Sequence, residues 1–171
     1  FAQIAFTPRK RLVREKPEAL PVPDAINGTG SMDFIHDQLS DGRRYRLFNV
    51  IADFNREGWG IEIDFSWPTM RVIRSLNQII EWRGKPRVIY CDTQPEYIRG
   101  HWLAWAERNG IRIDDIASGK PQQNAYVEHY NRTVRYDGLR HYLAESIQGS
   151  ARLCNTLDGA YNHERPNFPV R

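Results

Sequence analysis

The stretch GKPQQNAYVEHYNR, residues 119–132, carries the pattern around which the rest of the chain can be organised. Gly119 and Pro121 bracket Lys120 as a turn, and a helix can begin just after Pro121. Helical spacing places four polar residues on one face: Asn124, Glu128, Asn131 and Arg135. It places an apolar stripe about a quarter-turn away: Val127, Tyr130 and Val134. The apolar stripe can pack on a core, while the polar face suits a carboxylate that holds a metal ion close to a phosphate backbone.

Length and composition bound the class of protein. The chain has 171 residues, of which 40% are hydrophobic and 12% aromatic, which predicts one globular domain with a proper core. No apolar run approaches the length of a membrane span, and no signal-peptide core follows the basic N-terminus. Because the chain begins at Phe1 without a methionine, we expect a fragment or a processed product.

The net charge of +3 is concentrated at the N-terminus. Residues 1–20 hold two acidic residues and a basic run, and the rest of the chain sums to zero. Bulk charge therefore does not argue for nucleic-acid binding by the core, and the basic run is typical of a solvated linker. The basic residues are Arg9, Lys10, Arg11, Arg14 and Lys16.

The two cysteines, Cys91 and Cys154, match no zinc spacing and form no disulfide framework. Cys91 lies in an apolar run and is expected to be a small buried residue. This cysteine usage fits a reducing, cytoplasmic setting.

Residues 1–29 are interpreted as a basic, proline-rich linker, and the domain is expected to begin near residue 30. Hydrophobic periodicity then predicts five strands and four helices. The third strand alternates clearly, with Trp59, Ile61, Ile63 and Phe65 expected on one side. The predicted strands span residues 31–36, 45–52, 59–65, 87–92 and 111–113, and the predicted helices span 68–83, 98–109, 122–136 and 145–162.

The order of these elements, β-β-β-α-β-α-β-α-α, predicts an α/β domain. Its mixed five-stranded sheet contains an antiparallel meander followed by alternating helices and strands, with helices on its faces. In a sheet ordered 3-2-1-4-5, the first and fourth strands are neighbours, so Asp33 and Asp92 would lie side by side. A helix could then bring Glu128 over them.

Each of these carboxylates has an ordinary structural interpretation when it is taken alone. Asp33 could face solvent, Asp92 could cap a helix or start an Asx-turn, and Glu128 could be a helix-surface residue. Together, three converging carboxylates without matching cations repel one another unless divalent cations neutralise them. Hard oxygen ligands favour Mg²⁺ or Mn²⁺, and two such ions suit in-line phosphoryl transfer.

Five stretches of the sequence form a specific combination: Ser31-Met32-Asp33-Phe34, Asp53-Phe54-Asn55-Arg56-Glu57, Asp92 with Pro95-Glu96-Tyr97, the Gly119-to-Arg132 stretch, and Tyr161-Asn162-His163-Glu164-Arg165-Pro166. With these stretches, residues 29–168 resemble the catalytic core of bacterial insertion-sequence transposases, which are related to retroviral integrases.

The resemblance implies an RNase H-like fold and a metal-dependent Asp-Asp-Glu triad at Asp33, Asp92 and Glu128. In this family, hydrolysis or strand transfer frees a 3′-hydroxyl at the element's end, and that hydroxyl attacks target DNA. The implied partners are element ends, target DNA and further copies of the chain. The resemblance also implies an end-binding helix-turn-helix part and a last C-terminal segment of the core, and we expect neither within residues 1–171. Residues expected along the DNA are Lys120, Asn124 and Arg132.

The sequence departs from the family pattern at four positions. The family usually has Asn-Gly after Asp92, where this chain has Thr93 and Gln94. Gly30 and Gly138 stand where relatives commonly carry a large aromatic residue, and we expect lost packing there. A degenerate transposase remnant that keeps the fold and DNA binding is therefore the alternative to an active enzyme.

Two further function classes stay open from the sequence. A metal-dependent nuclease of the same fold would cut DNA or RNA without joining strands, and a scaffolding protein would bind no divalent metal. Several aromatic and histidine residues are interpreted as structural or surface residues rather than ligands: His101, His129, His141, His163, Trp102, Trp105, Tyr161 and Asn162.

Overall fold

The computed structural model describes residues 25–92, 96–116 and 125–164. Five strands and four α-helices follow the predicted order, and a π-helical and a 3₁₀ turn lie between the last two helices. The strands are β1 (Thr29–Gln38), β2 (Arg44–Ala52), β3 (Gly58–Asp64), β4 (Val88–Cys91) and β5 (Arg112–Asp115). The helices are α1 (Thr69–Arg83), α2 (Glu96–Asn109), α3 (Ala125–Thr133) and α4 (Ile147–Glu164), with η2 (Val134–Gly138) and η3 (Leu139–His141) after α3.

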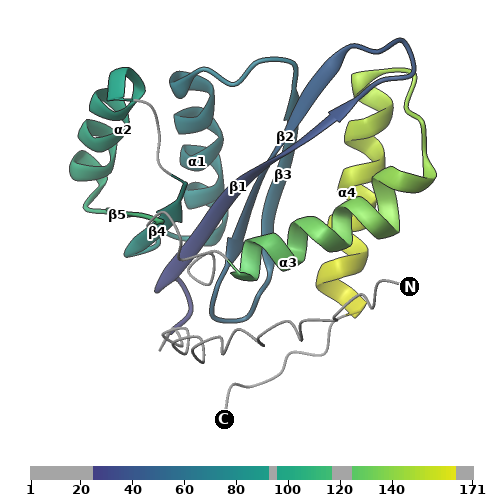
Figure 1. The fold of residues 1–171 in the computed structure, drawn as a ribbon. Coiled ribbons are helices and arrows are strands. Elements are labelled where there is room, and N and C mark those ends of the chain that lie inside the picture. Colours follow the sequence, from purple (N-terminus) through teal and green to yellow (C-terminus); the bar gives the residue numbers. More distant parts are fainter. Residues whose placement is uncertain (1–24, 93–95, 117–124, 165–171) are drawn as a thin grey trace, which may run out of the picture.

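The five strands form one mixed sheet in the order β3-β2-β1-β4-β5, as the sequence predicted. β1, β2 and β3 are antiparallel neighbours, and β4 lies parallel to both β1 and β5. Gly42 lies in the predicted hairpin turn between β1 and β2, and its φ of 85° is a conformation that favours glycine. β1 pairs with β4 only through residues 29–31, so the β1–β2 hairpin extends well beyond β4 (Figure 1).

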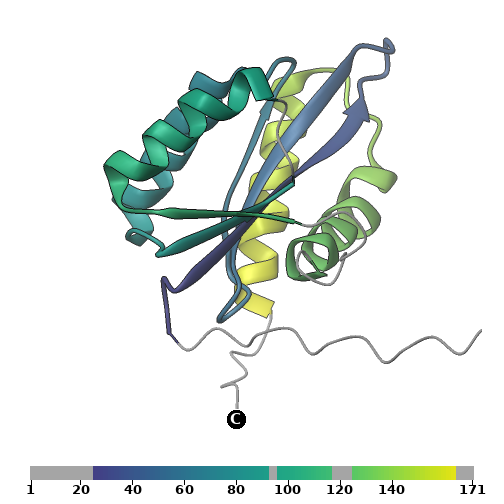
Figure 2. The same cartoon turned by 60° about the vertical axis from the view of Figure 1, so that its left-hand side comes forward.

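Helices cover both faces of the sheet and enclose two separate hydrophobic cores. α1 and α2 lie on one face, and α3 and α4 lie on the other (Figure 2). Side chains of β1 alternate between the two: Met32 joins the core under α1 and α2, and Ile35 joins the core under α3 and α4. Trp102 and Trp105 are buried on α2 and stack at 5.0 Å, which confirms their structural role. Among the described residues, no helix is long and apolar enough to cross a membrane.

The predicted alternation of the third strand was partly wrong. A register shift between Val50 and Ile51 inserts an extra residue on β3. Because of this bulge, Trp59 packs into the core under α1 and α2, while Ile61 packs into the core under α3 and α4. Phe65 lies beyond the end of β3 and is 41% exposed.

The expectation of lost packing at two glycines was also wrong, because neighbouring side chains fill the space. A Cβ at Gly30 would lie 2.9 Å from Cζ3 of Trp59. A Cβ at Gly138 would overlap the Cδ1 atom of Leu157. Both glycines are buried, and the neighbouring side chains leave no room for a larger residue at either position.

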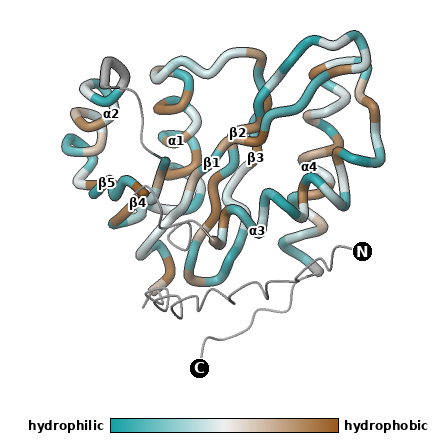
Figure 3. The backbone as a smooth tube through the Cα atoms, viewed as in Figure 1, coloured by the Kyte–Doolittle hydropathy of each residue, from teal (hydrophilic) through white to brown (hydrophobic). Residues whose placement is uncertain are grey.

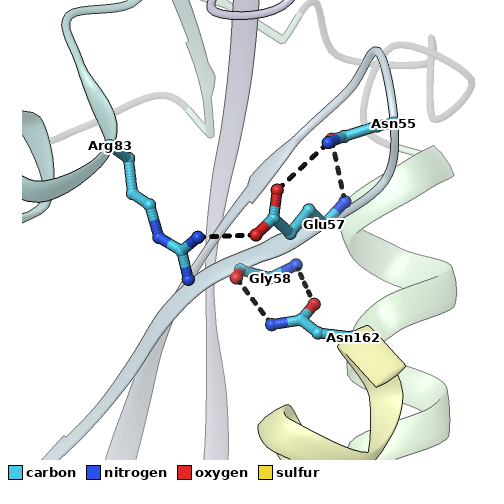
Figure 4. Close-up of polar contacts among 5 residues, drawn as sticks. All are labelled: Asn55, Glu57, Gly58, Arg83 and Asn162. Carbon is cyan, nitrogen blue, oxygen red and sulfur yellow. Dashed lines mark hydrogen bonds and ion pairs between the residues drawn. The ribbon is translucent and has the colours of Figure 1, made fainter. Parts of the chain in front are cut away.

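The Asn162 side chain fixes the end of α4 to the backbone of Gly58 at the start of β3 (Figure 4). Asn162 Oδ1 accepts from the Gly58 N–H at 2.8 Å, and Asn162 Nδ2 donates to the Gly58 carbonyl at 3.1 Å. Glu57 accepts from Arg83 of α1 at 2.6 Å, which joins the same turn to the other face of the sheet. Asn162 therefore has the structural role predicted for it.

Candidate active site

Asp33 lies in the middle of β1 and faces α3. Its neighbours Met32 and Phe34 point to the opposite face of the sheet, because side chains alternate along a strand. Directly across on β2 is Asn49, which is fully buried and interrupts the apolar run of residues 47–52. The sheet therefore places a half-buried carboxylate beside a buried amide, under the helix that carries Glu128.

A chain of hydrogen bonds connects these side chains. Nδ2 of Asn49 donates to Oδ1 of Asn131 at 2.7 Å, and Nδ2 of Asn131 donates to Oδ2 of Asp33 at 2.8 Å. The Phe34 N–H donates to the other carboxylate oxygen of Asp33 at 2.8 Å. Asn131 thus fixes the orientation of Asp33, and the buried Asn49 fixes Asn131. The sequence had placed Asn131 on the polar face of this helix, while a lone amide in the apolar β2 run was the signal that could have pointed to Asn49.

Opposing effects act on the pKa of the Asp33 carboxyl group. Burial raises the pKa of Asp33, and the negative charge of Asp92 raises it further. The hydrogen bonds from Phe34 and Asn131 act in the other direction and lower this pKa. A cation placed between the two aspartates would remove their repulsion.

Asp92 comes directly after β4, at the carboxyl end of that strand. The parallel register pairs Ser31 with Tyr90, so two residues further along Asp92 is level with Asp33. Its influence on the Asp33 pKa shows that the two carboxylates lie within electrostatic reach.

Glu128 and Asp33 line one groove of about 280 Å³ between β1 and α3. Glu128 is exposed in the first turn of α3, and Val127 and Tyr130 bury the opposite side of this helix. The groove also carries Asn131, Arg132 and Arg135, and Arg135 lies in the wider turn that follows α3. The polar face predicted for this helix therefore lies against Asp33.

The described residues do not form a finished metal site. Among them, no three His, Cys, Asp or Glu side chains are close enough together to hold one metal ion. The available donors are carboxylate oxygens, which suit Mg²⁺ or Mn²⁺, and the repulsion between Asp33 and Asp92 favours a divalent cation. Lys120, Asn124, Thr93 and Gln94 lie outside the described residues.

Asp53, part of one of the five stretches that carry the resemblance, is a buried carboxyl group bonded to Ser31, two residues before Asp33. It is 4% exposed and accepts a hydrogen bond of 2.7 Å from the Ser31 hydroxyl. Burial raises the pKa of Asp53 to about 7, although the Ser31 hydrogen bond and the charge of Arg56 act against the rise. Asp53 joins the start of β1 to the end of β2, and its backbone N–H donates to the Thr29 carbonyl at 3.0 Å.

Asp53→Asn is expected to stabilise the protein at neutral pH but not in acid. The folded protein keeps a proton on Asp53 up to about pH 7, whereas the unfolded chain loses it near pH 4. Wild-type stability contributed by this group therefore falls as pH rises from 4 to 7, and the neutral amide avoids that loss, worth about 2–4 kcal/mol. Urea unfolding across this pH range measures the difference between the two proteins. The exposed Asp137→Asn serves as control, and parallel curves for wild type and Asp53→Asn would contradict a raised pKa.

Comparison with solved structures defines the fold. A chain of the simian T-cell lymphotropic virus intasome in complex with the PP2A regulatory subunit B56 gamma gives a TM-score of 0.74 at 17% identity, over 89% of this chain and 54% of that chain. The HTLV-2 integrase catalytic core domain in complex with magnesium gives a TM-score of 0.67 at 16% identity over 84% of this chain and 91% of that chain. The fold is therefore RNase H-like, as predicted.

The sequence comparisons give the family. Residues 23–121 match one integrase core domain model, and residues 109–167 match a second. This chain belongs to the integrase core domain family, which confirms the resemblance to insertion-sequence transposase cores.

Two relatives come from insertion elements. A 31.7 kDa protein of insertion element IS407 from Burkholderia multivorans is 33% identical over 98% of this chain. A 39.2 kDa protein of insertion element IS476 from Xanthomonas euvesicatoria is 34% identical over 92% of this chain. The chain spans 62% and 45% of the lengths of these two relatives.

Proposed function

We propose that this chain is the catalytic core of a DNA transposase, which cleaves DNA and transfers strands with divalent metal ions. One observation carries the proposal: Asp33 and Asp92 come from adjacent parallel strands, and Glu128 lines the same groove as Asp33. Membership of the integrase core family and similarity to insertion-element proteins support it.

The residues that would hold two Mg²⁺ or Mn²⁺ ions are Asp33 and Asp92, with Glu128 completing the set. The magnesium complex of the structurally similar HTLV-2 core supports this choice of metal. When bound, such ions activate an attacking oxygen and stabilise a leaving oxygen in an in-line displacement. Because Asp33 and Glu128 come from different elements, a shared ion would join strand β1 to helix α3.

The chain's own residues orient the reacting groups. Asn131 holds one oxygen of Asp33 in place and, through its hydrogen bond, favours the ionised carboxylate. The exposed guanidinium groups of Arg132 and Arg135 lie along the groove, where they can neutralise phosphate charge. In strand transfer, the 3′-oxygen of the element end forms a bond to a target phosphorus. The bond from that phosphorus to the target's own 3′-oxygen breaks. This leaving oxygen takes up a proton, in exchange for the one that the attacking 3′-hydroxyl loses.

The partners follow from the same proposal. They are the DNA of the element ends, target DNA and further copies of the chain, and Lys120, Asn124 and Arg132 are proposed to contact the DNA. The intasome and dimeric core described for the structurally similar viral integrases support assembly on DNA. An end-binding helix-turn-helix part is proposed to act together with this core, and the protein would act in the bacterial cytoplasm at the nucleoid.

Calorimetric titration with Mn²⁺ and Mg²⁺ tests the proposal at its metal site. We expect wild-type protein with bound duplex DNA to bind Mn²⁺, and Asp92→Asn to weaken that binding at least about tenfold, since it removes a charged ligand. Asp137→Asn is the matched control, because Asp137 is an exposed aspartate outside the groove.

Two results would count against the proposal. Equal Mn²⁺ affinity in wild type and Asp92→Asn would place the metal elsewhere. Complete absence of binding, with and without DNA, would favour the degenerate remnant.

A further inference from the structure

A second groove lies at the far end of the β1–β2 hairpin, separate from the one that contains Glu128. Its volume is about 790 Å³, larger than the groove beside Asp33. Its lining includes His36 and Gln38 of β1, Arg44 and Arg46 of β2, and Phe65 after β3. The far end of the hairpin is markedly hydrophilic in Figure 3, although the inner parts of the same strands are apolar.

The register of the hairpin groups the polar side chains in this groove. His36 is paired directly with Arg46, and Gln38 with Arg44, so the four residues alternate onto one face of the two strands. Arg46 rests over the Phe34 ring at 5.2 Å, which fixes the position of its guanidinium. The result is a small, ordered cluster of hydrogen-bond donors.

The two arginines are not neutralised within the described part of the chain. Neither Arg44 nor Arg46 forms an ion pair with any described residue. The groove also contains Asp37, whose carboxylate accepts a hydrogen bond of 3.2 Å from the Tyr45 hydroxyl. Asp64 lies directly across from Arg46 on β3, but it forms an ion pair with Arg71 of α1. With Asp37 as the one acid in the lining, the two arginines leave a positive groove that is suited to an anion.

The second groove and the candidate active site share strand β1 but lie on opposite faces of the sheet, because His36 and Gln38 alternate with Asp33 along the strand. β1 bonds to β4 only through residues 29–31, so its outer edge over residues 32–38 has no strand partner among the described residues. His36 is close enough to Asp33 to lower the pKa of that carboxyl group. Along the strand, His36 and Gln38 lie about 10 and 17 Å beyond Asp33, roughly three to five base-pair steps of DNA. A duplex that runs along this open edge can therefore contact Asp33 on one face of the sheet and the groove on the other.

We propose that this second groove binds the phosphate backbone of the DNA duplex whose reacting phosphate lies at Asp33, through Arg44, Arg46 and His36. This inference rests on the proposed function for the choice of duplex. Contacts of this kind hold DNA in register without selecting its sequence. The groove would thereby set the angle at which the duplex crosses the active site.

The salt dependence of DNA binding tests the groove without any catalysis. Binding of a random-sequence duplex is measured by fluorescence anisotropy at several salt concentrations, with no divalent metal. For Arg44→Gln/Arg46→Gln we expect the slope of log affinity against log salt to become shallower by about 2, with roughly tenfold weaker binding near physiological salt. Arg44→Lys/Arg46→Lys should retain most of the slope, because it preserves both charges.

Two further variants keep the inference falsifiable. Lys85→Gln/Arg108→Gln removes the same charge from exposed positions at the ends of α1 and α2, and it should leave the slope nearly unchanged. Because Arg46 also packs over Phe34, Arg44→Gln alone should lower the slope by about 1 in a protein that keeps this contact. An unchanged slope in the groove variants, or an equal loss in the control, would overturn the inference.

A photocrosslinking residue in place of Phe65 locates the contact directly. Phe65 lines the groove and is 41% exposed, so p-benzoylphenylalanine there should crosslink DNA. The same residue at Tyr142, which is 62% exposed and outside the groove, should not. The reverse pattern would refute DNA binding at this groove. A protein that binds DNA through the groove but never joins strands would refute only the proposed function.

Discussion

Asp33→Asn should reduce strand transfer by about a thousandfold or more while leaving the fold intact. The amide has one acceptor oxygen, so it keeps the hydrogen bond from the Phe34 N–H and loses the one from Asn131, a local change that leaves the sheet in place. It lacks the negative charge, however, and a neutral oxygen is a poor ligand for Mg²⁺ or Mn²⁺. A metal ion contributes several kcal/mol to such a displacement, and about 1.4 kcal/mol corresponds to a factor of ten in rate.

The measurement is joining of a labelled element-end duplex to plasmid DNA in Mn²⁺, with thermal unfolding as the check of fold. The element-end sequence is taken from the genomic flanks of the gene. Glu128→Gln should show a comparable loss, because Glu128 lines the same groove as Asp33. Asp137→Asn, just beyond α3 but outside the groove, should remain active. Full activity of Asp33→Asn would show that this carboxylate has no role in strand transfer.

Gly58→Ala should destabilise the protein by about 3 kcal/mol or more, the largest stability effect that we expect from a single methyl group. A Cβ at Gly58 would overlap Asp158 Oδ1 and lie 2.9 Å from the Tyr130 hydroxyl. Those two groups form a hydrogen bond of 2.6 Å, and Tyr130 is fully buried. Displacing the pair leaves a buried hydroxyl and a half-buried carboxylate without their hydrogen bond, in addition to the steric cost.

Urea unfolding measures this loss against a control from the same helix. Nothing lies within 4 Å of a Cβ at Gly159, the residue that follows Asp158 in α4. Gly159→Ala should therefore stabilise the protein by up to about 1 kcal/mol, because alanine loses less backbone entropy in a helix. Equal stabilities for the two variants would show that the turn can yield at Gly58 without cost.

The sheet could be predicted because its strands carry their own periodicity. β2, β3 and β4 are apolar or alternating runs bounded by turn residues, and the predicted order of all five strands is the observed order. The exceptions were local. The bulge at Val50 and Ile51 that turns Trp59 to the other face depends on pairing between strands, which a single-strand pattern does not contain.

The prediction of lost packing at Gly30 and Gly138 was wrong for a related reason. From the sequence, a missing aromatic side chain suggested a void. In the fold, Trp59 and Leu157 from distant segments occupy the same spaces. Volume is shared between residues that are far apart in the chain, so one position alone does not reveal whether a core is filled.

The sequence by itself determined the chemical types and their order: two strand aspartates, a helix glutamate with an asparagine three residues later, and the alternation that directs them. Only the tertiary structure decided that Asn49 holds Asn131 against Asp33, and that His36 and Arg46 meet across a hairpin. Periodicity is a property of each segment, whereas these contacts depend on strand register and on how helix α3 docks on the sheet. Both follow from the packing of the whole chain.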